Sequence, residues 1–205
     1  MPGALGAAAI AAAAAATLVS CEGEKKKYLD AVLPLAAQMD KLAADVEAVA
    51  AVAPDPGRGH EADGRLAGIE GTIKKLNTEF TSILAPVDCA YDHANMVKAL
   101  ASEATGVSAL RGYFGRSVAE GVLRARIEDL REREAALSDG IKGSGKESPG
   151  IEKRKLEHQR VKGDLEKIGK EQRLLKSEMD GQFKYYQDNH RFFKAHLRVY
   201  KENLK

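Results

Sequence analysis

Apolar residues recur at alternating spacings of three and four along most of this chain, which is the period of an amphipathic α-helix. One such stripe covers Leu29–Ala50 and a second covers Leu66–Ile83. The segment from Pro54 to Gly64 lies between them and is rich in Pro and Gly, so we expect a loop there. We expect Pro34 either to open the first helix or to kink it.

A third helical stripe spans residues 96–141. Three glycines lie within it: Gly106, Gly112 and Gly115. Glycine costs about 1 kcal/mol relative to alanine inside a helix, so we expect a break near residues 112–115. Ser117 and Glu120 have the spacing of a capping box, which predicts that the helix restarts there.

The last tract, Ile151–Leu204, contains no proline. The Gly- and Ser-rich segment before it, Ser138–Gly150, predicts a turn that ends in an N-cap at Ser148. The stripe of this tract consists of Val161, Leu165, Ile168, Gln172, Leu175, Met179, Phe183, Tyr186, His190, Phe193, Leu197, Tyr200 and Leu204. Gln172 and His190 are polar, and a polar residue at such a position most often fixes the register between helices.

The stripes form three long helical tracts: residues 29–84, which contain the first two stripes and their loop, residues 92–141 and residues 151–204. Their comparable length predicts an all-α fold over residues 29–205. We expect an elongated antiparallel three-helix coiled-coil bundle with kinked or broken first and second helices, because such long helices cannot bury their stripes alone. At a rise of 1.5 Å per residue, the last tract would reach about 80 Å. The chain is 30% charged and 5% aromatic and has no Trp, which fits helices with extensive surface.

The N-terminal residues have the features of a targeting signal. Residues 4–19 are almost wholly apolar, a run shorter than the roughly 20 residues that span a bilayer and typical of a signal-peptide core. No Lys or Arg precedes this run, which departs from the usual basic start of a signal peptide. The run ends in Leu18-Val19-Ser20-Cys21, which resembles the lipobox of bacterial lipoproteins.

The lipobox resemblance implies that residues 1–20 are removed and that Cys21 carries lipid, palmitate included, on its thiol and new amino group. Residues 21–28 would then form a charged tether. The protein would be a lipid-anchored component of the bacterial cell envelope that faces the periplasm or the cell surface. With Cys21 modified, Cys89 is left alone and cannot form a disulfide within the chain.

The sequence shows no pattern of catalytic or metal-binding residues. Cys89 and His93 are four apart and could share a helix face, but a structural metal site needs about four ligands. The glycine-rich segment Gly140–Lys146 follows no strand and lacks the spacing of a phosphate loop. We therefore predict no cofactor, no metal and no enzymatic activity.

Charge is distributed unevenly although the net charge is only +2, which gives no reason to expect nucleic-acid binding. Residues 22–115 hold ten basic and fourteen acidic side chains, whereas residues 116–205 hold twenty-two and sixteen. Basic residues gather in the first half of the last tract: Lys153, Arg154, Lys155, Arg160, Lys162, Lys167, Lys170, Arg173 and Lys176. They form either a solvated face with i,i+4 ion pairs or a surface for anionic lipid.

A second resemblance concerns the C-terminal half. The segments IEDLRERE (127–134), KRKLEHQR (153–160), FKYY (183–186) and FFK (192–194) are similar in arrangement to the last two helices of BAR domains. BAR domains are dimeric three-helix coiled coils that bind and bend membranes through basic residues. The resemblance implies the same activity here, with the nine basic residues as lipid contacts.

Two hypotheses of function follow. The first is a non-enzymatic, lipid-anchored helical scaffold or spacer at a bacterial membrane surface, and the second is a BAR-like dimer that binds and shapes anionic membranes. We also expect a homodimer, because the glycines of the second tract leave little surface to cover the aromatic stripe near the C-terminus. That stripe consists of Phe183, Tyr186, Phe193, Leu197 and Tyr200.

Overall fold

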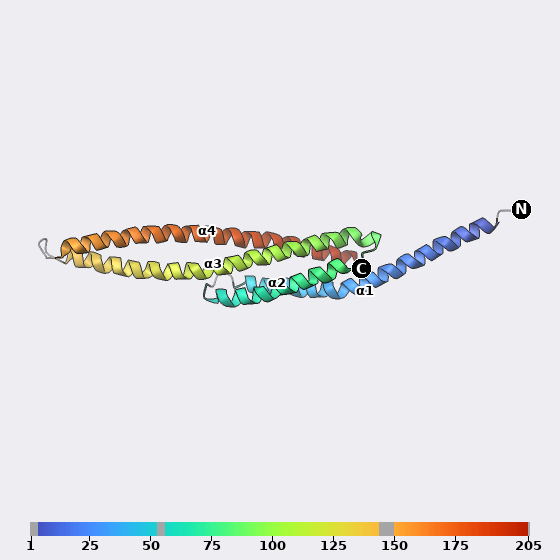
Figure 1. Cartoon of the computed structure of the whole chain (residues 1–205), viewed down its shortest axis with the longest axis horizontal. Helices are drawn as coiled ribbons and strands as arrows, with labels where there is room; N and C mark the ends of the chain where they lie inside the picture. The colour runs from blue at the N-terminus through green and yellow to red at the C-terminus, as the bar shows by residue number, and fades with distance from the viewer. Residues whose placement is uncertain (1–3, 53–55, 144–149, 205) are drawn as a thin grey trace. The chain divides into compact units, whose positions relative to one another are not determined.

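The computed structural model describes residues 4–52, 56–143 and 150–204, and for residues 4–21 and 56 it describes the backbone alone. Its regular structure is helical throughout these ranges, which confirms the all-α prediction. The helices are α1 (Ala4–Ala50), α2 (Gly59–Ser82), α3 (Ala90–Lys142) and α4 (Ile151–Asn203), as Figure 1 shows. Short 3-10 helices, Pro56–Arg58 and Val87–Cys89, precede α2 and α3.

The chain divides into two compact units. Unit 1 contains residues 1–48, 67–108 and 186–205, and unit 2 contains residues 49–66 and 109–185. Helices α3 and α4 each contribute to both units, so each unit brings together segments that are far apart in the sequence.

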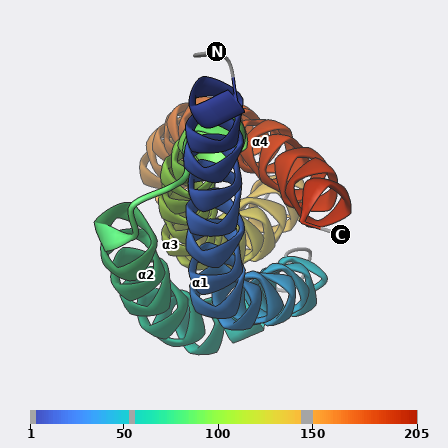
Figure 2. The ribbon, with the colours of Figure 1, turned by 90° about the vertical axis from the view of Figure 1, so that its right-hand side faces the viewer.

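Unit 1 is a four-helix arrangement around one apolar core, and Figure 2 shows its helices in end view. Each helix contributes fully buried side chains: Val32, Met39 and Val46 from α1, Leu76 and Phe80 from α2, Met96, Leu100 and Val107 from α3, and Phe193 from α4. Truncating one such side chain to alanine typically costs 2–5 kcal/mol, so this core is the main source of stability in unit 1.

Unit 2 consists mainly of the antiparallel pair formed by α3 and α4, with the beginning of α2 packed at one end. Its apolar cluster joins Ile127 and Leu130 of α3 to Val161 and Ile168 of α4. These residues lie on the predicted stripes of the two tracts, so the spacing of three and four correctly identified the faces that meet.

The predicted break in the second long tract is wrong, because α3 runs without interruption from Ala90 to Lys142. Ser117 does not cap a new helix: its hydroxyl donates to the carbonyl oxygen of Phe114 one turn back, at 2.8 Å. Leu110 and Phe114 are fully buried beside the glycines, and this packing outweighs the helix cost of Gly112 and Gly115.

Gly106 is at a close approach of two helices in unit 1. A Cβ atom on this residue would lie 3.0 Å from the Cβ of Asn189 on α4. The glycine therefore lets α3 and α4 approach one another, a role that the sequence interpretation did not give it.

Two further expectations need correction. The segment 59–64, predicted as part of a loop, is the first part of α2, so the loop is shorter than expected. Helix α1 continues through Pro34, so Pro34 does not open the helix, and its side chain is exposed. The two stripes expected on either side of the loop belong to α1 and α2, and the predicted N-cap at Ser148 lies outside the described residues.

The aromatic stripe near the C-terminus is covered by the chain itself. Tyr186, Phe193, Leu197 and Tyr200 are all buried, and Phe183 is partly buried against Tyr113 of α3, with ring centroids 5.2 Å apart. The premise that this stripe stays uncovered is thus wrong, and these residues offer no apolar surface to a second chain.

Candidate functional site

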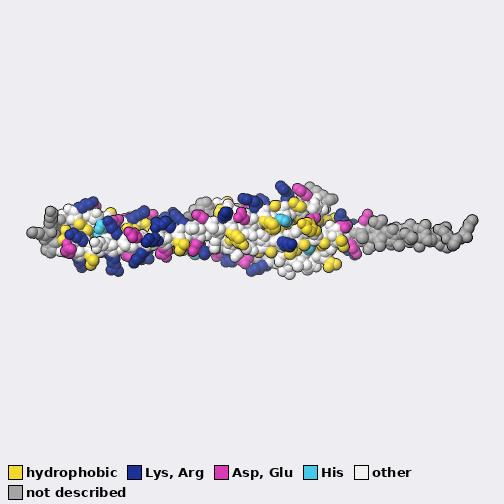
Figure 3. Space-filling model, turned by 90° about the horizontal axis from the view of Figure 1, so that it is seen from above, with side chains coloured by type: hydrophobic (Ala, Val, Ile, Leu, Met, Phe, Trp, Pro, Cys, Tyr) yellow, Lys and Arg dark blue, Asp and Glu magenta, His cyan; other side chains and the backbone are white. Residues whose placement is uncertain are grey.

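The nine basic residues predicted to contact anionic lipid are all exposed and all belong to α4 of unit 2. Figure 3 shows Lys and Arg side chains crowded along this part of the molecule, with acidic side chains among them. The structure therefore places the predicted residues on the surface, where a lipid or another anion could reach them.

Four of the nine are engaged within the chain. Lys155 pairs with Glu152 at 3.0 Å, Lys162 with Glu134 at 3.7 Å and Lys176 with Glu120 at 3.7 Å. The Arg154 guanidinium donates to the carbonyl oxygen of Gly140 at 3.3 Å. The other five make no ion pair among the described residues: Lys153, Arg160, Lys167, Lys170 and Arg173.

A basic and apolar stripe follows the outer side of α4 in unit 2. Its residues are spaced 4, 3, 4, 3, 4 and contain no carboxylate: Leu156, Arg160, Gly163, Lys167, Lys170 and Leu174. We call this set the outer stripe. Leu156 is 70% exposed and Leu174 is 62% exposed. Exposed leucines beside unpaired cations are the side chains that an anionic membrane surface favours.

A groove of about 600 Å³ lies between α3 and α4 next to the outer stripe. Apolar side chains of Leu130, Leu156 and Val161 line it together with the cations Lys153 and Arg160. Arg133 also lines the groove, but it is already paired with Glu157. Glu157 and Asp164 also line the groove, so its cations stand beside two carboxylates and do not form a dedicated site for an anion.

Polar side chains inside unit 1 bond to one another across helices. The Tyr28 hydroxyl of α1 lies 2.7 Å from the Tyr200 hydroxyl of α4 and 3.1 Å from Nδ1 of His93 on α3. Phe80 of α2 stacks on the His93 ring, with centroids 4.3 Å apart. Burial lowers the pKa of His93 and raises that of Tyr200, so this junction joins all four helices through neutral groups.

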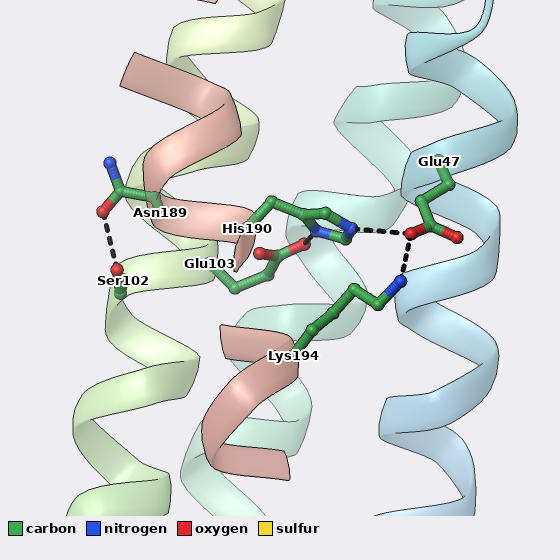
Figure 4. Close-up of polar contacts among 6 residues, drawn as sticks. All are labelled: Glu47, Ser102, Glu103, Asn189, His190 and Lys194. Atoms are coloured by element: carbon green, nitrogen blue, oxygen red, sulfur yellow. Dashed lines mark hydrogen bonds and ion pairs between the residues drawn. The ribbon is translucent and has the colours of Figure 1, made fainter. Parts of the chain in front are cut away.

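A second junction in unit 1 is ionic (Figure 4). Nδ1 of His190 on α4 lies 2.9 Å from Oε1 of Glu103 on α3, and Nε2 lies 3.4 Å from Oε1 of Glu47 on α1. Glu103 is fully buried and His190 nearly so. Lys194 pairs with the same Glu47 oxygen, and Ser102 donates to Asn189 at 2.6 Å beside the cluster.

His190 carries a proton on both ring nitrogens in the state that this geometry favours, because each nitrogen faces a carboxylate acceptor. Burial by itself lowers the pKa of His190, but the hydrogen bonds and charges of Glu103 and Glu47 outweigh burial and raise it. Lys194 and His190 together lower the pKa of Glu47 against a smaller effect of burial. The cluster thus brings opposite charges together, and Oε2 of Glu103 is buried beside it without a hydrogen-bond partner in the described part of the chain.

Unit 2 contains a third polar junction, centred on the buried carboxylate of Glu120 on α3. Gln172 of α4 donates to it at 2.9 Å and Arg124 at 2.8 Å. Burial opposes ionisation, but these two hydrogen bonds lower the pKa of Glu120. Gln172 therefore bonds across the helix pair, which agrees with its predicted role in register.

The sequence interpretation missed the partners of its two polar stripe residues. Glu103, which binds His190, was not singled out, and Glu120, which binds Gln172, was interpreted only as part of a capping box. A signal was present for Glu103, because it stands between Leu100 and Val107 at core spacing in an apolar stripe. A carboxylate at such a position requires a buried partner.

Replacing His190 or His93 with Gln should change the pH dependence of stability in opposite directions. The pKa of His190 is higher in the folded protein than in the unfolded chain, where it is about 6.5. The contribution of His190 to folding stability is therefore complete below about pH 6.5 and is lost as pH rises through the folded pKa. The folded pKa of His93 is lowered, so its contribution falls as pH decreases below about 6.5. Urea unfolding of wild type and both variants from pH 5 to 8.5 measures this, and parallel curves for all three would contradict it.

Within the described residues, no helix has the length and apolar character needed to cross a membrane, and no group of three or more His, Cys, Asp or Glu side chains is placed to hold a metal ion. The side chain of Cys21 lies outside the described residues.

Comparison with family models, with curated proteins and with solved structures finds no protein that matches this chain.

Proposed function

We propose that this protein is a non-enzymatic, lipid-anchored helical scaffold or spacer at a bacterial membrane surface. The observation that carries the proposal is the position of Cys21 within α1. Tyr28, the first buried side chain among those that the structure describes in unit 1, follows Cys21 by seven residues in the same helix. At 1.5 Å per residue this separation is about 10 Å, so an anchor at Cys21 would hold unit 1 close to the membrane.

The interior of the protein supports a structural role. Several buried polar groups in both units make contacts between helices, as at Tyr28–Tyr200, His190–Glu103 and Glu120–Gln172. An active site would instead need such groups to converge on a cavity with room for a substrate. Helices joined at several levels by polar contacts suit a rigid spacer.

Replacing Cys21 with Ala should move the protein from the membrane fraction of a bacterial host to the soluble fraction, because the lipid attachment site is lost. Intact-mass analysis of the wild-type protein should show loss of residues 1–20 and added lipid. Cys89→Ala is the matched control and should remain in the membrane fraction. An unprocessed wild-type N-terminus in a bacterial host would refute the anchor.

A second function, binding and shaping of anionic membranes by a BAR-like dimer, is favoured by the outer stripe. Each Lys or Arg near an anionic bilayer contributes about 1 kcal/mol, and the two exposed leucines could enter the headgroup region. The acidic side chains that surround the stripe weaken this attraction. A scaffold would need no such binding, so vesicle binding without the anchor separates the two functions.

The chain from Glu22 onward retains every buried side chain of the described residues and suits this test. If the second function holds, this fragment should bind phosphatidylglycerol vesicles but not phosphatidylcholine vesicles, and added salt should weaken the binding. Lys167→Glu with Lys170→Glu should lower the affinity at least tenfold. Lys41→Glu with Lys98→Glu, an equal charge change on exposed residues of unit 1, should leave it unchanged. Failure to bind either type of vesicle would exclude the membrane-shaping function and leave the scaffold as the proposed function.

A further inference from the structure

A groove of about 850 Å³ runs along unit 1 between α1 and α4. Five alanines make its lining small and apolar: Ala36, Ala37, Ala43, Ala44 and Ala195. Leu33, Leu197 and Leu204 complete the apolar surface, and Leu33 is 49% exposed. The groove extends along α1 from Leu33 to Glu47, which is about 21 Å or four helical turns. A surface of this length suits a second extended protein surface better than a compact small molecule.

The two sides of the groove carry opposite charges. The α1 side presents the carboxylates of Asp40 and Glu47. The α4 side presents one acid, Glu202, and four cations, which are Arg191, Lys194, Arg198 and Lys201. Asp40 pairs with Lys201 and Glu47 pairs with Lys194 within the chain. Arg191 and Arg198 have no ion pair among the described residues, so the α4 side keeps an excess of positive charge.

We propose that a second copy of this chain docks on this groove, face to face, about a twofold axis parallel to the helices. That axis places α1 of each copy opposite α4 of the other, so each acidic side meets a basic side. A twofold axis across the helices would instead set α1 against α1 and α4 against α4. Like charges would then face each other, which disfavours that arrangement.

The ion pairs within each chain set the levels along the groove. Asp40 is level with Lys201 and Glu47 with Lys194, and Arg198 lies between these two levels on α4. In the proposed dimer, Arg198 of one copy can therefore reach a carboxylate on α1 of the other. A carboxylate has about four lone-pair sites and can accept from its own lysine and from this arginine together. The alanines allow the helices of the two copies to approach closely.

Apart from the buried Leu197, this surface shares no residue with the aromatic stripe near the C-terminus, and the inference does not depend on lipid at Cys21. Ala44 lies in the groove and is exposed, so a lysine there should not disturb the core of unit 1. Ala48, one turn along α1, is also exposed but does not line the groove, which makes it the matched control.

Sedimentation of the full chain in mild detergent at tens of micromolar tests the dimer. We expect a dimer for wild type and for Ala48→Lys, and at least a tenfold weaker dimer for Ala44→Lys and for Arg198→Glu, with helicity by circular dichroism unchanged. A monomeric wild type would overturn the proposal. A dimer that is insensitive to Ala44→Lys would overturn the groove as its surface. A dimer strengthened by Arg198→Glu would indicate like helices in contact and would overturn the proposed axis.

Discussion

The buried ion pair between Glu103 and His190 ties the register of α4 to that of α3 in unit 1. A carboxylate out of water costs several kcal/mol unless a partner compensates it, and the core of unit 1 supplies that partner from one position on α4. Sliding α4 by one residue would leave Glu103 charged, buried and unpaired. The pair therefore selects one register, and Gly106 beside it permits the close approach of the two helices that the register requires.

The separation of interior and surface decides where function can reside. Inside both units, polar groups bond to each other and hold helices together, as Glu120 does with Gln172 in unit 2. Outside, the outer stripe of unit 2 and the charged groove of unit 1 stay available for interaction, and the lipid proposed at Cys21 would add a third point of attachment. These features suit attachment to a membrane and to another protein surface, and together they favour a scaffold over a catalyst.

The helices themselves could be predicted because local patterns determine them. The apolar spacing placed α4 and its buried face, and the prolines after Ala50 separated α1 from α2. The continuity of α3 through Gly112 and Gly115 could not be predicted, since it depends on packing by residues distant in sequence. The partner of His190 lies 87 residues away, and no local pattern specifies such a pairing. The basic residues were placed correctly on the surface, but which of them are paired depended on the neighbouring helix.

A double-mutant cycle on Glu103 and His190, measured by chemical denaturation, tests the central claim most directly. His190→Leu leaves the buried Glu103 carboxylate without its partner, whereas Glu103→Leu leaves His190 with Glu47 alone at 3.4 Å, and each replacement should cost about 3–5 kcal/mol. The double variant leaves no unpaired charge, so it should lose no more stability than either single variant. Losses that simply add would show that the two side chains act independently, and they would contradict the role of this pair in fixing the helix register.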